Sequence, residues 1–255
     1  MNRFSAVLAS AMTALALAPA GAATTGPTRA VSGPALNRSA VSASHNWAGE
    51  AIQTRASGTF QGVYATWHVP RVRATARDRY SSTWVGVDGA NNAALIQTGT
   101  EGDSIQGRTV YRAWWEILPR SETLIRYTNG QPVTVRPGDA MVAYVVRTPR
   151  PHRWKISLVD STQGWRFTTI RRYNGPGTSA EWIQEATSVG GRVGPIPAFS
   201  PVTFAQLAVA ESGRWYRTAL TGANAVALVQ RRRVKAFPAA LTSSTPQQFT
   251  VYYKR

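Results

Sequence analysis

The chain of 255 residues contains no cysteine. It therefore has no disulfide, no thiol nucleophile and no thiolate ligand for a metal. Its three histidines, His45, His68 and His152, lack the spacing of a zinc site. The motifs His-Glu-x-x-His and Gly-x-Ser-x-Gly and the Asp-Thr-Gly pair are also missing. A hydrolase built from this sequence needs less common catalytic groups, and we expect it to use neither a metal nor a cofactor.

Acidic residues are scarce, 12 against 29 basic residues, which gives a formal net charge of +17. Such a charge suits nucleic acids and anionic surfaces, or keeps an exported protein soluble. The densest basic runs, Arg71–Arg73 and Arg231–Arg233, are short, and no DNA-binding helix or arginine-aromatic RNA motif accompanies them. We therefore favour a solvated surface and expect no specific nucleic-acid partner.

Long apolar runs are absent beyond the N-terminus. Arg3, a short apolar segment and the small residues Ala20-Gly21-Ala22 form the pattern of a secretory signal peptide, residues 1–22. Residues 23–45 are rich in Ala, Ser, Thr, Gly and Pro and are expected to be a propeptide or linker outside the core. The sequence thus predicts no membrane span and export, either to the medium or to a periplasm.

The remaining residues, 46–255, show β patterns and no convincing amphipathic helix. Trp154, Ile156 and Leu158 alternate with polar residues, as in a half-buried strand. Similar short segments, separated by turn residues such as Asn129-Gly130, recur about every 8–12 residues. We expect a single all-β domain, an antiparallel sandwich or barrel.

Two short segments contain candidate catalytic residues: ALIQTG contains Gln97, and AEWIQE contains Glu181. Without a Ser, Cys or metal nucleophile, water must attack the substrate, and one group must take its proton and later donate a proton to the leaving amine. A glutamate fills that role, and a glutamine amide donates to the oxyanion. Taken alone, Gln97 is more simply interpreted as a solvated or turn-bonding side chain, and Glu181 as a carboxylate paired with an arginine.

Several blocks, in order, resemble the glutamic peptidase family, the eqolisins, over essentially all of residues 46–255. They are Asn46-Trp47-Ala48-Gly49, Thr66-Trp67-His68-Val69-Pro70, Ser82-Thr83-Trp84-Val85-Gly86-Val87-Asp88-Gly89, Ala94-Leu95-Ile96-Gln97-Thr98-Gly99, Ala113-Trp114-Trp115-Glu116 and Ala180-Glu181-Trp182-Ile183-Gln184-Glu185. The chain is more basic than the better-known relatives and lacks the disulfides that several of them carry.

This resemblance implies a sandwich of two antiparallel sheets, of the concanavalin A-like or jelly-roll type, with a substrate cleft on the concave face of one sheet. It implies Gln97 and Glu181 as the catalytic dyad of an endopeptidase that cleaves proteins at acidic pH. We expect a secreted monomer acting on protein or peptide substrates. Residues expected to line the cleft are Trp47, Trp84, Asp88, Trp115, Glu116 and Glu185.

A second hypothesis is a non-catalytic β-sandwich module that binds carbohydrate or an anionic surface. Nine tryptophans and the high positive charge are compatible with it, and fold alone does not choose between the two. A cationic protein that binds nucleic acid or a cell envelope through charge is a third.

Overall fold

The computed structural model describes residues 39–217, 220, 222–239 and 247–255. The expected signal peptide and residues 23–38 of the expected propeptide or linker lie outside the described residues. No helix in the described part of the chain is long and apolar enough to cross a membrane.

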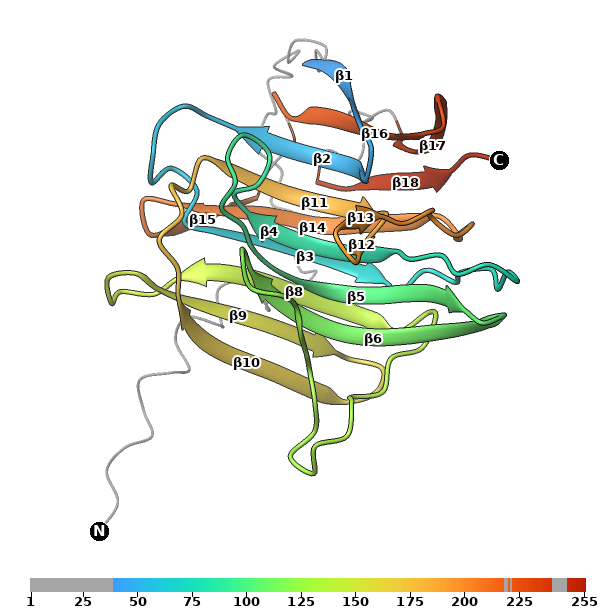
Figure 1. Ribbon diagram of the computed structural model, residues 1–255. Coiled ribbons are helices and arrows are strands. Elements are labelled where there is room, and N and C mark those ends of the chain that lie inside the picture. The colour runs from blue at the N-terminus through green and yellow to red at the C-terminus, as the bar shows by residue number, and fades with distance from the viewer. Residues whose placement is uncertain (1–38, 218–219, 221, 240–246) are drawn as a thin grey trace, which may run out of the picture. The chain divides into compact units, whose positions relative to one another are not determined.

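The described residues form eighteen strands, labelled in Figure 1. In chain order they are β1 (Ser39–Ser44), β2 (Trp47–Gln53), β3 (Gly62–His68), β4 (Ser82–Val87), β5 (Ile96–Ile105), β6 (Arg108–Ile117), β7 (Thr123–Leu124), β8 (Ala140–Arg147), β9 (Arg153–Asp160), β10 (Trp165–Arg172), β11 (Ser179–Glu185), β12 (Ser188–Val189), β13 (Arg192–Val193), β14 (Val202–Glu211), β15 (Arg214–Arg217), β16 (Asn224–Gln230), β17 (Arg233–Pro238) and β18 (Phe249–Tyr253).

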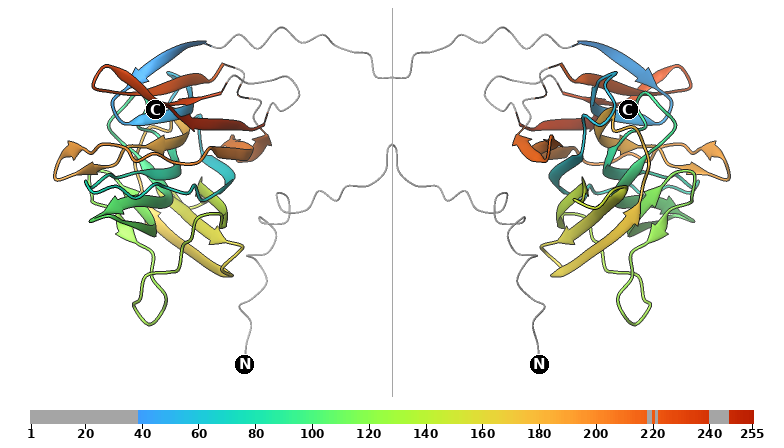
Figure 2. Two further views of the ribbon diagram at one scale, coloured as in Figure 1. Left: turned by 90° about the vertical axis from the view of Figure 1, so that its right-hand side faces the viewer. Right: turned by 90° about the vertical axis from the view of Figure 1, so that its left-hand side faces the viewer.

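The strands pair in the order β10-β9-β8-β3-β14-β18-β17-β16-β2-β11-β4-β5-β6-β7, and β15 adds to β14. This long path folds over itself, so that β4 and β5 pack against β8 and β9, and β11 packs against β3 and β14 (Figures 1 and 2). Strands that are hydrogen-bonded neighbours in this order run antiparallel to each other. The expected all-β antiparallel sandwich is therefore confirmed.

Residues 39–44 differ from the expectation. They fall in the predicted propeptide or linker, yet they form β1, which pairs in parallel with β16. The segment SAVSAS has only small side chains apart from Val41, which is 57% exposed. Backbone hydrogen bonds attach this strand to the sheet without burying a large apolar side chain.

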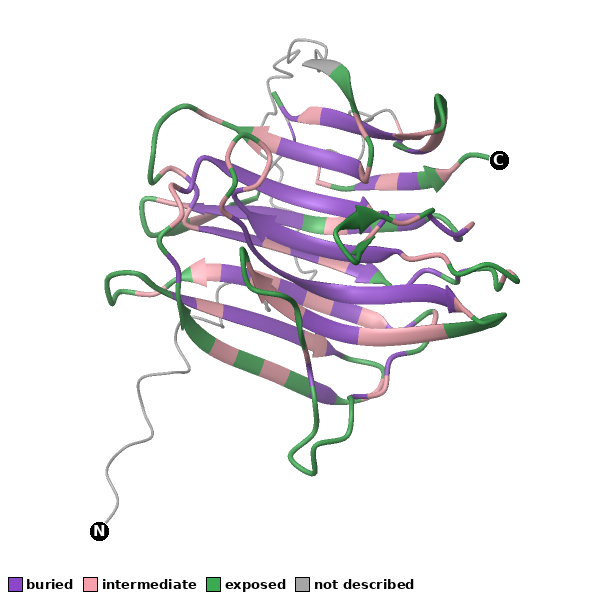
Figure 3. Cartoon of the chain, viewed as in Figure 1, coloured by how far each residue is buried: buried purple, intermediate pink, exposed green. Residues whose placement is uncertain are grey.

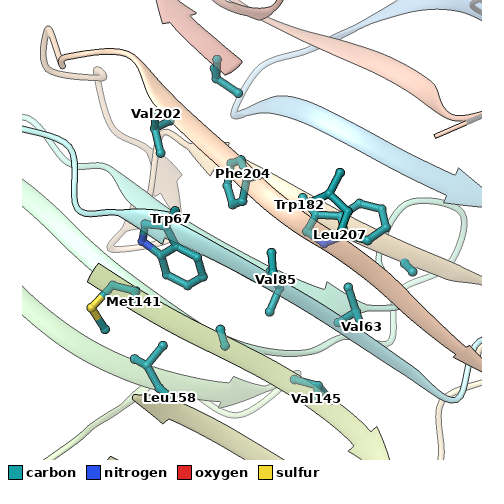
Figure 4. Close-up of a cluster of buried hydrophobic side chains, with 14 of the residues drawn as sticks. Val63, Trp67, Val85, Met141, Val145, Leu158, Trp182, Val202, Phe204 and Leu207 are labelled. Carbon is teal, nitrogen blue, oxygen red and sulfur yellow. The ribbon is translucent and has the colours of Figure 1, made fainter. Parts of the chain in front are cut away.

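Alternation of side chains gives each strand of the β2-β11-β4-β5-β6 layer two faces. On the inner face, turned toward the other layer, Trp182 of β11 joins a core that includes Phe204 of β14 (Figure 4). The Trp182 Nε1–H also donates to the backbone oxygen of Tyr64 on β3, at 2.9 Å, and so links the two layers. Burial is greatest along β11, β4 and β5, the purple strands at the middle of Figure 3.

Candidate active site

The outer face of this layer, turned away from the other layer, carries a row of residues at one level of four adjacent strands. Glu181 on β11 pairs with Gly86 on β4, Gly86 pairs with Gln97 on β5, and Gln97 pairs with Glu116 on β6. Residues that pair directly point to the same face. Since neighbouring strands lie about 4.8 Å apart, the Cα atoms of Glu181 and Gln97 are about 10 Å apart.

Gly86 forms the floor between the two expected catalytic residues. A Cβ atom there would lie 2.9 Å from the Trp84 ring, 3.0 Å from Leu95 Cδ1 and 3.3 Å from Gln97 Cβ. Contacts this short are rarely tolerated without a shift of the neighbours. The absence of a side chain at this position therefore keeps space between Glu181 and Gln97.

Gln97 is 4% exposed, and its amide is held at one end. Its Nε2 donates to Glu116 Oε2 at 2.6 Å, whereas its Oε1 is buried and has no hydrogen-bond partner among the described residues. Burial raises the pKa of Glu116, and the hydrogen bond from Gln97 lowers it in part. The hydrogen bond leaves the second N–H of the Gln97 amide available.

Glu181 lies in the middle of the sheet and is fully buried. Neither of its carboxylate oxygens has a hydrogen-bond partner among the described residues. Burial raises its pKa well above the ordinary value, and the charge of Asp88 raises it further. The Ser179 hydroxyl and the Ala90 backbone N–H point toward the carboxylate from beyond regular hydrogen-bond geometry, and their donor dipoles lower this pKa in part. Unsatisfied buried polar atoms are uncommon in proteins and call for a functional or strain explanation.

Asp88 follows β4 and is fully buried, with a positive φ of 71°. Its Oδ2 accepts from Tyr173 Oη at 2.6 Å and from the Gly177 backbone N–H at 2.9 Å. Its Oδ1 accepts from the Thr178 backbone N–H and from Asn92 Nδ2, both at 2.9 Å. Asp88 thus fixes the segment before β11 and reaches Glu181 through its charge, with no hydrogen bond to the dyad.

Glu185 shares the outer face with Glu181, four residues along β11. Its Oε1 accepts from Asn46 Nδ2 at 2.9 Å and its Oε2 from Trp84 Nε1 at 2.7 Å. Burial raises the pKa of Glu185 to about 7, while the hydrogen bonds lower it in part. The rings of Trp47 and Trp84 meet edge to face, with centroids 5.1 Å apart. Glu185 and these two tryptophans therefore lie together beside the row, and their expected part in a substrate cleft stays a prediction.

Trp115 does not join them. It pairs with Thr98, one residue out of step with the row, and packs on the inner face, where the Arg171 guanidinium lies 5.0 Å from its ring centre. Its neighbour Trp114 takes the place on the outer face and packs with Leu95 and Ile183. Trp114 was missed by the sequence interpretation, although the period of two along β6 groups it with Glu116 rather than Trp115.

The outer face also carries a cluster of acidic residues, although the chain as a whole is basic. Five of the twelve acidic residues in the sequence lie on it, namely Glu101, Asp103, Glu116, Glu181 and Glu185. Arg112 Nη1 binds Glu101 Oε2 at 2.8 Å and Asp103 Oδ2 at 3.4 Å. Burial and the charge of Glu101 raise the pKa of Asp103 to about 7. In the part of the chain that the structure describes, no group of three or more His, Asp or Glu side chains is arranged to hold a metal ion.

The amino-acid sequence matches a known protein family. The sequence model of the Peptidase A4 family matches residues 45–253. Aspergillopepsin-2 from Aspergillus niger is 26% identical over 194 residues, which are 67% of this chain and 66% of that relative. The alignment thus spans slightly less than two thirds of the relative's length.

Solved structures show the same fold. Scytalido-glutamic peptidase with a transition-state analogue inhibitor has a TM-score of 0.69 at 21% identity, covering 82% of this chain and 98% of that structure. Aspergilloglutamic peptidase from Aspergillus niger has a TM-score of 0.58 at 24% identity, covering 69% of this chain and 99% of that structure. The resemblance to glutamic peptidases and the expected enzyme class are confirmed at the level of the family: the chain belongs to the Peptidase A4 family.

Proposed function

We propose that this chain is a secreted endopeptidase that hydrolyses protein substrates at acidic pH, with Glu181 and Gln97 as its catalytic residues. The observation that carries the proposal is the row across Gly86, where buried polar atoms of Glu181 and Gln97 lack partners on one face. A water molecule and a scissile carbonyl would supply those partners. Family membership supports peptide-bond hydrolysis as the reaction.

In this mechanism Glu181 takes a proton from the attacking water and then donates it to the leaving amine. The burial that raises its pKa makes its carboxylate a stronger base than an exposed glutamate. One N–H of Gln97 stays on Glu116, which orients the amide, and the other N–H donates to the oxyanion of the tetrahedral intermediate. The unpartnered Oε1 of Gln97 accepts from the water.

Burial of the carboxyl groups makes the stability of this site depend on pH. Each raised pKa means that the folded state favours the protonated form. The folded site is therefore most stable when these groups are protonated, and ionisation toward neutral pH weakens it. General-base catalysis needs the ionised form of Glu181, so activity falls as pH drops through the pKa of this residue. Hydrogen bonds from a bound water favour the carboxylate and lower this pKa in the complex.

The test compares wild type with Glu181→Gln and Gln97→Ala on a denatured protein substrate, over a series of acidic pH values and with a chelator present. We expect Glu181→Gln to abolish cleavage and Gln97→Ala to lower kcat by about 10²–10³, the effect of losing one oxyanion donor. Glu211→Gln, at the end of β14 in the other layer, is the matched control and should keep full activity. Circular dichroism verifies that each variant is folded.

Full activity in either dyad variant would remove that residue from the mechanism. Absence of cleavage by wild type at every pH would favour the binding-module hypothesis. Secretion is tested separately by sequencing the N-terminus of the exported protein, where loss of residues 1–22 is expected first and loss of residues up to about 45 marks the mature enzyme. An exported protein that still begins at Met1 would contradict the proposed signal peptide.

A further inference from the structure

Strands β17 and β18 carry lysines and aromatic rings on one exposed face. The two strands lie side by side next to the C-terminus (Figure 1), and Phe237 of β17 pairs directly with Tyr252 of β18. Residues that pair directly share a face, and so do residues two apart along a strand. Lys235 and Lys254, which lie two residues from Phe237 and Tyr252, therefore share the face of the rings.

The two lysines face each other across the strands. The backbone N–H of Lys254 donates to the backbone oxygen of Lys235 at 2.8 Å, which continues the pairing of β17 and β18 by one residue. Neither lysine forms an ion pair with a described residue. Like charges directly opposite each other destabilise a sheet. This pairing therefore lowers the stability of the free protein, and an anion bound between the two ammonium groups would reverse the effect.

The aromatic pair lies one step further along the same face. Phe237 is 37% exposed and Tyr252 is 40% exposed, and their ring planes meet at 29° with centroids 6.0 Å apart. Next to Tyr252 on this face, the hydroxyls of Thr250 and Thr203 lie 2.8 Å apart. Single exposed apolar side chains are common, but two adjacent rings beside two cations form a surface that suits a ligand.

Positive charge is concentrated around this face. Residues 212–255 contain eight basic residues and no acidic residue. The turn between β16 and β17 consists of Arg231 and Arg232, with φ angles of 51° and 61°. Asn and Gly are the usual residues at two successive positive φ angles, and arginine is less stable there. The turn thus adds two cations near the start of β17 in place of residues that would fit its backbone better.

The chemistry of this face suits a single-stranded nucleic acid. Proteins bind such strands with cations that contact the phosphates and with exposed aromatic rings on which unpaired bases stack. The lysine pair and the ring pair are about 7 Å apart along the strands, so one short strand reaches both. A phosphodiester also stays ionised in acid, whereas an ordinary carboxylate is neutralised near its pKa of about 4.

We propose that this lysine–aromatic face, defined by Lys235, Phe237, Tyr252 and Lys254, binds single-stranded nucleic acid without sequence preference. The lysines contact phosphates and the rings contact bases. The sequence has no motif that reads bases, which agrees with binding through charge and stacking alone. The inference is independent of the proposed peptidase function, because β17 and β18 carry none of the residues of the candidate active site.

The experiment measures the binding of a fluorescently labelled octathymidylate by anisotropy, at about pH 5.5 and over a series of NaCl concentrations. The folded Glu181→Gln protein is used, so that self-cleavage does not interfere. We expect the octathymidylate to bind at least about tenfold more tightly than a DNA duplex of the same length. The duplex has the higher charge density, but its bases are stacked on each other and do not reach the rings.

Two double variants in the same background test the role of the lysines. Lys235→Gln/Lys254→Gln should weaken binding about tenfold or more. It should also make the plot of log K against log salt shallower by about 1.4, because each lost phosphate contact removes about 0.7 from the slope. Arg108→Gln/Arg166→Gln removes the same charge at exposed positions on β6 and β10, and should leave affinity and slope nearly unchanged.

A third double variant tests the rings. Phe237→Leu/Tyr252→Leu keeps apolar side chains and all of the charge, and removes only the aromatic surface. We expect the affinity for the octathymidylate to fall about tenfold or more, with an unchanged salt slope and an unchanged affinity for the duplex. Circular dichroism verifies that each variant is folded.

Equal losses in the two charge variants, or equal affinities for the single strand and the duplex, would overturn the proposal, because either result means diffuse charge attraction. An unchanged affinity in the leucine variant would overturn it as well. Polygalacturonate and vesicles that contain anionic lipid are the alternative probes. If one of them binds through Lys235 and Lys254 and the octathymidylate does not, the face recognises a different polyanion and the nucleic-acid assignment is wrong.

Discussion

Asp103 should make the folded domain less stable at neutral pH than at acidic pH. Asp103 is 1% exposed and its pKa rises to about 7, because burial and the charge of Glu101 both favour the protonated form. The Ser81 backbone N–H donates to its Oδ1 at 3.0 Å, and Arg112 lies 3.4 Å from its Oδ2. Arg112 is shared with Glu101, which it approaches to 2.8 Å, so it compensates Asp103 only in part.

The sign follows from comparing the two states. Below the unfolded pKa of 3.8 both states hold the proton, and Asp103 has no effect on stability. Between 3.8 and about 7 the unfolded chain releases the proton while the folded chain keeps it, so the free energy of unfolding falls as pH rises. At about 1.4 kcal/mol per pH unit the full effect is about 4 kcal/mol, and relaxation and water penetration around the buried carboxyl group reduce it to about 2–4 kcal/mol.

Urea unfolding of wild type and Asp103→Asn at about pH 4 and about pH 7 provides the measurement. Asn keeps the acceptor for the Ser81 N–H and removes the ionisation. The fall in free energy of unfolding between the two pH values should be smaller in the variant by about 2–4 kcal/mol. Glu211→Gln serves as the control and should keep the wild-type difference. A wild type that gains stability toward pH 7, or a variant with the wild-type difference, would refute this reasoning.

Three further substitutions test other parts of the domain. Gly86→Ala places a Cβ 2.9–3.3 Å from three side chains, and should cost about 1–3 kcal/mol of stability and lower kcat/KM at least about tenfold, as measured by urea unfolding and peptidase assay. Tyr173→Phe removes the 2.6 Å hydrogen bond to the Asp88 carboxylate and should cost about 1.5–3 kcal/mol, and an unchanged urea midpoint would contradict the assigned role of Asp88. Trp182→Ala should cost about 3–5 kcal/mol, and a loss below about 1 kcal/mol would show that this fully buried side chain does not join the layers as described.

Local sequence patterns predicted the fold class, but they did not predict all of the strands or how the strands pair. The alternation of Trp154, Ile156 and Leu158 is found in β9, where all three side chains are buried. β1 was not predicted, since a strand of small residues that attaches through its backbone has no apolar alternation to detect. Nor does any local pattern show that β11 lies between β2 and β4, because their segments are far apart in the sequence.

At the candidate site, the sequence indicated Gln97 and Glu181 only through the blocks around them. Their common face depends on the register of three strands, which a single sequence does not encode locally. The error over Trp115 could have been avoided. Adjacent residues of a strand point to opposite faces, so Trp114, and not Trp115, shares the face of Glu116. Asp88 was expected to line the cleft, and its hydrogen bonds to the segment before β11 could not be predicted because Tyr173, Gly177 and Thr178 lie 85–90 residues later in the sequence.

The position of the row inside the sheet has a consequence for how activity is lost on heating. β11 is hydrogen-bonded on one side to β2 and on the other to β4, and β5 is held in the same way by β4 and β6. Segments paired on both sides open only with the cooperative unit to which they belong, whereas edge strands and loops fray at low cost. Backbone amide protons of Glu181 and Gln97 should therefore exchange as slowly as those of the core. Separation of the two residues then accompanies unfolding of the sheet itself, with no earlier local step.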